Sequence, residues 1–189
     1  MKHDLVLADR AEKALPLLDE AIGIFNSIMN TGGVADVRRV LARVHSKAER
    51  WDEADRELTL SLETYKQNRT AFGRASALTQ RATVRRQAGR SADAQRDAAE
   101  SVRLFREESP SDSGESAALL ELARCRLVLG DPDNARRHAE DALARSANLG
   151  TARTAGIREF IDGLAPVDTL ARGTTDTSVP EEEPHDAAG

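Results

Sequence analysis

Small and apolar residues recur at fixed offsets in four segments of the chain. The first position of the pattern is an alanine in every segment, and successive alanines lie 40 or 41 residues apart: Ala14, Ala54, Ala94 and Ala135. The residues four, seven and eight positions after each alanine are again small or apolar. These offsets share one face of an α-helix, because an α-helix has 3.6 residues per turn. The pattern therefore predicts four helices, here called B helices, that each pack closely against another helix.

A second set of periodic segments precedes three of the B helices. These segments, here called A helices, are expected at residues 35–48, 76–88 and 116–129. Gly89 and Gly130 suit the C-terminal ends of two A helices. Ser91 and Asp131 suit the N-caps of the B helices that follow them. Each A helix is therefore expected to form a hairpin with the next B helix.

Polar segments that contain glycine separate one hairpin from the next. They lie at residues 30–33, 69–73 and 110–114. Glycine among polar residues is typical of loops, so we expect loose connections at these three places. The whole pattern predicts a stack of helical hairpins joined by loops.

A last amphipathic segment follows the fourth B helix. Its apolar residues are spaced as on one helix face: Ile157, Phe160, Ile161 and Leu164. In a stack of repeats each unit buries its apolar face only against its neighbours, so the final unit needs a cover. We expect this segment to be a C-terminal capping helix. After Pro166 the periodicity ends, and residues 166–189 are expected to be a disordered acidic tail behind a repeat domain at residues 1–165.

The composition agrees with a helical protein that forms a core. Of the 189 residues, 40% are hydrophobic and 31% charged, while only 3% are aromatic. Few aromatic residues and many alanines favour packed helices over a sheet sandwich or barrel. No apolar run approaches the roughly 20 residues of a membrane span, and no secretory signal is readable at the N-terminus. With a single cysteine the chain cannot form an internal disulfide, so we expect a cytoplasmic protein.

The negative charge is concentrated at the C-terminus. The formal net charge of the chain is −5, and the segment from residue 165 onward, with six acidic residues and one arginine, already accounts for −5. Residues 1–164 are therefore close to neutral. A nucleic-acid-binding domain would be expected to be basic, so the charge gives no case for nucleic acid as a partner.

The repeated positions resemble those of the tetratricopeptide repeat (TPR) family. Small residues at the family's eighth position would be Ala42, Ala82 and Ala123, and the alanines of its twentieth position would be Ala54, Ala94 and Ala135. Two features depart from the family: the period is 40 or 41 residues instead of 34, and Glu49 stands where glycine is usual. Such lengthened repeats resemble those of bacterial signalling ATPases and helix–turn–helix regulators, and the period also overlaps that of HEAT and armadillo repeats.

The resemblance implies an all-α fold, a right-handed α-solenoid of TPR-like helical hairpins with a C-terminal capping helix. It also implies a non-enzymatic module, regulatory or scaffolding, that binds a protein or peptide in a groove lined by the A helices. The alternative is a sensory or interaction fragment of a larger transcription regulator or signalling ATPase. The groove residues that the family register implies are Arg39, Arg43, Lys47, Arg86, Leu120, Arg124 and Leu127.

The chemistry of these groove positions favours an acidic and apolar ligand. Arg39, Arg43 and Lys47 recur every four residues and so share one helix face. The planar guanidinium of arginine donates two parallel hydrogen bonds to a carboxylate or phosphate. The opposing interpretation is a solvated face of arginines, because an excess of arginine over lysine is common in proteins from GC-rich genomes.

No catalytic or cofactor-binding constellation is readable in the sequence. The histidines lack the spacing of a metal site, and no phosphate-binding loop, dinucleotide fingerprint or nucleophile motif occurs. Cys125 lies between two arginines, which could lower the pKa of a thiol. Its place on a helix face of small residues instead favours a buried structural cysteine. We therefore expect neither an enzyme nor a bound cofactor or metal.

The family register also suggests that the first repeat is truncated. Counting back from Ala14, the first A helix would begin before Met1, and residues 5–9 resemble only the end of an A helix. The first B helix would then expose part of the apolar face that carries Leu18, Ile22 and Phe25. We expect this edge to be covered by self-association, by a partner protein or by an upstream segment of a longer chain. A two-fold homodimer is the simplest closed form.

Overall fold

The computed structural model of the chain describes residues 2–164, with side chains from Lys13 onward. These residues form eight α-helices and no strand. The helices are α1 (Lys2–Ser27), α2 (Thr31–Lys47), α3 (Trp51–Gln67), α4 (Ala71–Gln87), α5 (Ser91–Glu107), α6 (Asp112–Val128), α7 (Pro132–Arg145) and α8 (Thr151–Asp162). The expected tail at residues 166–189 lies outside the described residues. No helix of the described part is long and apolar enough to cross a membrane.

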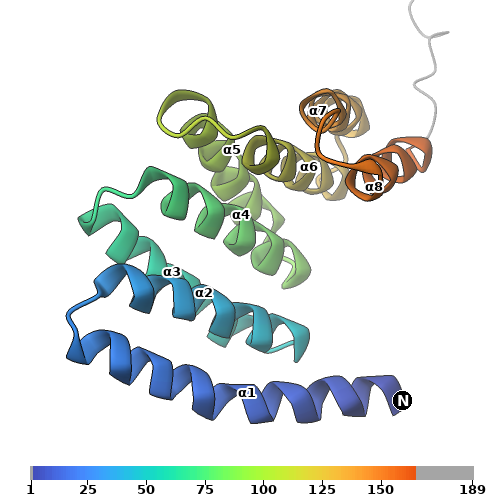
Figure 1. The fold of residues 1–189 in the computed structure, drawn as a ribbon. Helices are drawn as coiled ribbons and strands as arrows, with labels where there is room; N and C mark the ends of the chain where they lie inside the picture. The colour runs from blue at the N-terminus through green and yellow to red at the C-terminus, as the bar shows by residue number, and fades with distance from the viewer. Residues whose placement is uncertain (1, 165–189) are drawn as a thin grey trace, which may run out of the picture.

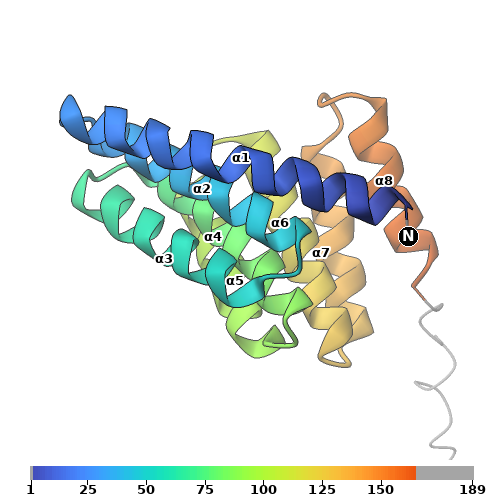
Figure 2. The same ribbon diagram turned by 90° about the horizontal axis from the view of Figure 1, so that it is seen from below.

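The helices form a solenoid of hairpins in two layers. The A helices α2, α4 and α6 lie in one layer and run in the same direction, while the B helices α3 and α5 lie behind them (Figures 1 and 2). Each A helix packs against the helix that follows it and against the helix that precedes it, which for α2 is α1. In addition, α4 contacts both α2 and α6. The A helices therefore form a continuous surface, as expected from the sequence.

The turn between each A helix and the following B helix contains a residue with positive φ, and an N-cap residue precedes the B helix. Gly89 and Gly130 have φ of 79° and 78°, in the left-handed region that glycine adopts without strain. Glu49 occupies the same place in the preceding hairpin with φ of 56°, so it takes this conformation with a side chain. The Asp131 side chain accepts a hydrogen bond from the Asn134 backbone N–H, as predicted for an N-cap. The prediction for Ser91 is wrong, because it is the first residue of α5 and Arg90 is the N-cap.

The expected loops between hairpins are present but shorter than predicted. Residues 30, 69–70 and 110–111 lie outside the helices, whereas the remaining residues of the three ranges form the first turns of the A helices. Thus α2, α4 and α6 begin four or five residues earlier than the sequence pattern predicts. The glycines at these starts are Gly33, Gly73 and Gly114, and the facing aromatic residues are Phe25, Tyr65 and Phe105. A Cβ atom on any of these glycines would lie less than 3.0 Å from the facing ring. These glycines therefore permit close packing of a ring on a helix; they do not mark loose connections.

Small residues occupy the helix contacts of the core, beside larger buried side chains such as Leu58 and Phe105. Ala54, Ala94 and Ala135 are fully buried, in agreement with their repeated position. A buried serine hydroxyl joins the two helices of each full hairpin. Ser61 donates to the carbonyl oxygen of Ala35 at 2.8 Å, and Ser101 donates to that of Ala75 at 2.7 Å.

The last full hairpin uses the same contact with the partners exchanged. There Ser116 of the A helix donates to the carbonyl oxygen of Ala142 of the B helix at 2.9 Å. Each hairpin thus places one serine and one alanine at the closest approach of its two helices. A larger side chain at either position would not fit, since both residues of each pair are fully buried.

The two ends of the solenoid differ. At the C-terminal end, Ile157 and Leu164 are buried and Ile161 packs against the core, so α8 caps the stack as predicted. At the N-terminal end, α1 is one continuous helix that includes residues 5–9, so these residues do not form the end of a separate A helix. Leu18, Ile22 and Phe25 are half-buried. This partial exposure agrees with the open edge expected from the sequence.

Other apolar residues at this N-terminal edge are more exposed: Leu17 and Ile24 on α1, and Ile28 and Met29 just after its end, with exposed fractions of 55% or more. Leu17, Ile24 and Ile28 lie seven and four residues apart and so form one stripe along α1 and the residue after its end. The helix α1 packs mainly against α2, and the three residues of this stripe are left exposed.

Candidate functional site

The seven predicted groove residues lie on the three A helices. Arg39, Arg43 and Lys47 belong to α2, Arg86 to α4, and the remaining three to α6. Because α4 contacts both neighbours, the side chains form one surface, here called the A-helix surface. The helices place these residues together, but the contacts they make divide them into two groups.

Arg39 is held by neighbouring side chains. Its Nε donates to Gln80 Oε1 of α4 at 3.0 Å, and its Nη1 lies 3.7 Å from Asp36 Oδ1. The Tyr65 hydroxyl donates to the same Asp36 oxygen at 2.6 Å. Burial of the ring, together with this hydrogen bond, raises the pKa of Tyr65 above its usual value. Arg39 thus links α2 to α4 and has little freedom to bind another group.

Arg86 and Arg124 share one buried carboxylate. Glu121 is 2% exposed, and its Oε1 accepts from Arg86 Nε at 2.6 Å while its Oε2 lies 3.4 Å from Arg124 Nη1. A buried carboxylate must be paired, so Arg86 is committed to joining α4 and α6. Glu121 was not among the site residues predicted from the sequence. Its spacing of three residues before Arg124 on one helix face was the available signal.

Arg43 and Lys47 are exposed and form no ion pair or hydrogen bond within the described part of the chain. They lie one turn apart on the C-terminal half of α2. At the other end of the A-helix surface, Leu120 is half-buried against the core, whereas Leu127 is 40% and Val128 61% exposed. The surface therefore offers two unpaired cations on α2 and an apolar patch on α6.

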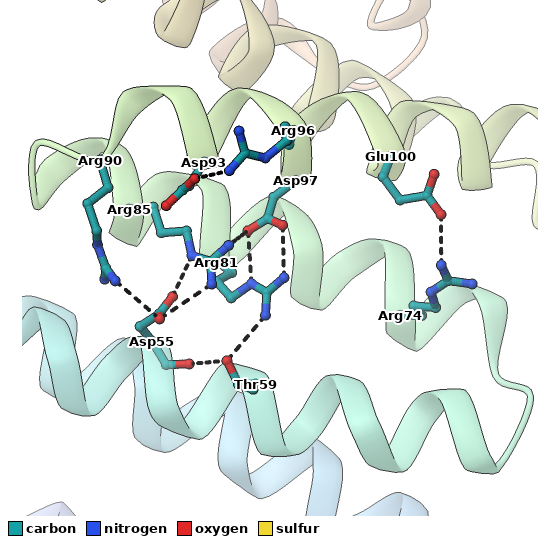
Figure 3. A network of polar contacts seen from close by, with 10 residues as sticks. All are labelled: Asp55, Thr59, Arg74, Arg81, Arg85, Arg90, Asp93, Arg96, Asp97 and Glu100. Atoms are coloured by element: carbon teal, nitrogen blue, oxygen red, sulfur yellow. Dashed lines mark hydrogen bonds and ion pairs between the residues drawn. The ribbon is translucent and has the colours of Figure 1, made fainter.

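A separate ion-pair network joins α3, α4 and α5 (Figure 3). Arg81 binds Asp97 through two hydrogen bonds of 2.8 Å, and Arg85 reaches Asp97 at 3.0 Å and Asp55 at 2.7 Å. The Arg90 guanidinium adds a contact of 3.4 Å to Asp55. The carboxylates and the first two arginines are mostly buried. Since these residues bind one another, we assign the network to packing between repeats.

Cys125 is a buried residue without the electrostatics of a reactive thiol. It is fully buried, as the helix face of small residues predicted. Burial, reinforced by the nearby Glu121 carboxylate, raises the pKa of the thiol to about 12. The neighbouring arginines therefore do not produce a thiolate near neutral pH.

We expect Cys125 to resist modification in the folded protein. At pH 8 a thiol with this pKa is ionised in only about one molecule in ten thousand, and the thiolate is the reactive form. Titration with a thiol-specific disulfide reagent should show no reaction over an hour in buffer and full reaction in 6 M guanidinium chloride. Reaction within minutes in buffer would contradict the buried position.

The histidines with described side chains do not form a metal site. His45 and His138 lie on different helices, and burial lowers the pKa of both below the usual value. Within the described residues no group of three or more histidine, cysteine, aspartate or glutamate side chains is placed to hold a metal ion.

Comparisons with known proteins agree with this architecture. Residues 73–148 match the sequence model described as tetratricopeptide repeat. The structure is similar to the crystal structure of BtubC (BKLC) from P. vanneervenii, with a TM-score of 0.67 and 18% sequence identity. That similarity covers 96% of this chain and 87% of that chain, and at this identity it shows the fold alone. No curated protein matches the sequence significantly.

Proposed function

Since the chain is a TPR-like protein, we propose that it is a non-enzymatic protein- or peptide-binding module whose ligand lies on the A-helix surface. TPR repeats generally mediate protein–protein interaction, and folds of this kind are typically non-enzymatic. The observation that carries the proposal is the pair of exposed, unpaired cations Arg43 and Lys47 on the same surface as the exposed Leu127 and Val128.

The chemistry of the surface favours a ligand with acidic and apolar residues. Each exposed ion pair to Arg43 or Lys47 contributes only about 0.2–1 kcal/mol to the binding free energy. These cations therefore contribute more to the specificity of binding than to its affinity. Covering the apolar residues of α6 adds about 25 cal/mol per Å² of buried surface. Arg39 and Arg86 hold the neighbouring A helices together through hydrogen bonds to Gln80 and Glu121.

Peptides selected from a displayed random library against the full chain should be rich in aspartate and glutamate next to apolar residues. The double substitution Arg43→Glu and Lys47→Glu should weaken their binding at least about tenfold, which corresponds to 1.4 kcal/mol. Both side chains are exposed, so the melting temperature should hardly change. Isothermal titration calorimetry measures the affinity.

The α3 helix offers a matched control for this double substitution. Arg56 is an exposed helix arginine like Arg43, and Lys66 stands in the last turn of α3 as Lys47 does in α2. Arg56→Glu with Lys66→Glu should leave peptide affinity unchanged. Equal losses in both double variants, or selected peptides without acidic residues, would overturn the proposal.

We place this binding role in the cytoplasm and consider it regulatory or scaffolding, as the sequence resemblance implies. The alternative, a sensory fragment of a larger transcription regulator or signalling ATPase, uses the same surface. This alternative is tested by sequencing the natural gene: it requires that the same reading frame encodes a DNA-binding or nucleotide-binding domain together with these repeats.

We also propose that the chain self-associates through α1. The supporting observation is that the exposed residues Leu17, Ile24 and Ile28 form a continuous stripe. A continuous apolar patch marks an interaction surface, whereas exposed apolar residues that are scattered singly do not. A two-fold dimer would pack one stripe against its copy.

Light scattering at micromolar concentration should show a dimer that Ile24→Glu dissociates. Asn26→Glu is the control, because Asn26 is exposed on the same helix about 200° away from Ile24. This control should leave the dimer intact. A monomer in the unsubstituted chain would show that the stripe is not a dimer interface.

A further inference from the structure

The A-helix surface carries an excess of positive charge. Its five cations are Arg39, Arg43, Lys47, Arg86 and Arg124. Only two carboxylates on this surface, Asp36 and Glu121, pair with them. The surface therefore has three more positive than negative charges, although residues 1–164 as a whole are close to neutral. Arg43 and Lys47 account for two of these three charges.

The acidic C-terminal segment has the complementary charge. Residues 165–189 carry six acidic side chains and one arginine, and three of the acids are consecutive at Glu181–Glu183. An apolar residue, Val179, precedes the three glutamates by two positions. This combination of an apolar and several acidic residues is the ligand chemistry that the A-helix surface favours.

The described chain ends beside this surface. The Arg136 Nη2 donates to the carbonyl oxygen of Leu164 at 3.0 Å, which places Leu164 near the start of α7. The start of α7 directly follows the C-terminal end of α6, where Leu127 and Val128 are exposed. Because α2, α4 and α6 run in the same direction, their C-terminal ends share one edge of the solenoid (Figure 1). Lys47 lies at that same edge, on α2.

The length of the segment is sufficient to reach α2. From Leu164 to Glu181 there are 17 residues. In extended form they span up to roughly 56 Å, at about 3.3 Å per residue. Packed helices lie about 8–10 Å apart, so the four successive helix spacings from α8 through α7, α6 and α4 to α2 amount to roughly 40 Å, which is still less than the reach of the segment. Along the segment Val179 comes before the glutamates, and along the solenoid the apolar patch of α6 comes before the cations of α2.

We propose that the segment around Val179–Glu183 binds the A-helix surface of its own chain and competes there with the peptide ligand. The inference rests on the proposed function, since it assigns an intramolecular occupant to the same surface. A covalently attached segment has an effective concentration of the order of millimolar, so a weak ionic and apolar contact is enough to occupy the surface. The contact is exposed and is weakened by salt.

The test uses a fluorescent synthetic peptide of residues 174–189 and measures its fluorescence anisotropy with the full chain at 50 mM NaCl. The triple substitution Glu181→Gln, Glu182→Gln and Glu183→Gln in the chain removes the competing charges. This variant should bind the peptide at least tenfold more tightly than the unsubstituted chain. Adding Arg43→Ala and Lys47→Ala to the triple variant should weaken binding at least several-fold, whereas adding Arg56→Ala and Lys66→Ala should leave it unchanged.

Equal peptide affinity for the unsubstituted chain and the triple variant overturns the proposal, because the attached segment would then not compete. If the peptide binds neither chain while library-selected peptides bind in a manner that depends on Arg43 and Lys47, this proposal is wrong and the proposed function stands. If neither kind of peptide binds, both are wrong. A dimer in the unsubstituted chain that the triple substitution dissociates would assign the segment to a second copy and overturn the intramolecular contact.

Discussion

Replacing Asp97 by asparagine should lower the free energy of unfolding by about 3 kcal/mol, as expected when one partner of a buried ion pair is removed. Asp97 has a side chain that is 8% exposed and binds two arginines, Arg81 and Arg85. Asparagine keeps one carbonyl oxygen but loses the charge, so two mostly buried guanidinium groups lose their shared counter-charge. For a chain of this size the melting temperature should fall by roughly 6–12 °C.

The same helix provides the control for this substitution. Asp93 lies one turn before Asp97 on α5, its side chain is 40% exposed, and it pairs with the exposed Arg96. Asp93→Asn should therefore change stability by less than about 0.5 kcal/mol. Urea denaturation followed by circular dichroism measures both variants. Equal losses for Asp93→Asn and Asp97→Asn would contradict a special role of the buried network.

The location of the Asp97 effect is a further expectation. In a solenoid each repeat contacts only its neighbours, so the loss should be concentrated where the network joins α3, α4 and α5. Amide hydrogen exchange in Asp97→Asn should accelerate in these three helices more than in α7 and α8. A uniform acceleration over all helices would mean that the described repeats unfold as a single unit.

Gly73→Ala should destabilise the protein by roughly 1–3 kcal/mol, the usual cost of overpacking. Alanine favours a helix over glycine by up to about 1 kcal/mol, so helix propensity alone predicts the opposite sign. The new Cβ atom would lie less than 3.0 Å from the ring of Tyr65. That ring cannot easily move, because it is 3% exposed and its hydroxyl is fixed by Asp36 at 2.6 Å.

A glycine without neighbours gives the matched comparison. Gly156 lies inside α8, and a Cβ atom there would meet nothing within 4 Å. Gly156→Ala should therefore stabilise the protein by about 0.5–1 kcal/mol. Thermal denaturation of the two variants should give shifts of opposite sign. Stabilisation by both substitutions would show that the Tyr65 ring does not pack on α4.

The helices that carry the candidate binding residues were predictable from the sequence, but the ion pairs of these residues were not. The family register placed Arg39, Arg43, Lys47, Arg86, Leu120, Arg124 and Leu127 on A helices, and each lies on one. The register could not tell which arginines are already paired. Arg86 meets Glu121 from 35 positions away in sequence, and only the packing of α4 on α6 brings the two together. The unpaired Arg43 and Lys47 therefore emerge as the binding candidates only in the structure.

The helical repeat is visible in the sequence alone. Helix periodicity and the need for small residues at helix contacts are local properties. The burial of Ala54, Ala94 and Ala135 at helix contacts could therefore be predicted from the sequence. The N-cap at Asp131 and the capping face that carries Ile157 were readable for the same reason.

The starts of the A helices and the charges that remain free depend on packing between helices. Gly33, Gly73 and Gly114 are typical loop residues by composition, yet they lie within helices because aromatic rings of the preceding B helices pack on them. In the same way, α1 continues through residues 5–9 where the family register would end a helix. Ring packing, ion pairing and helix continuation depend on residues that are distant in sequence, and a pattern read along one chain does not contain those distances.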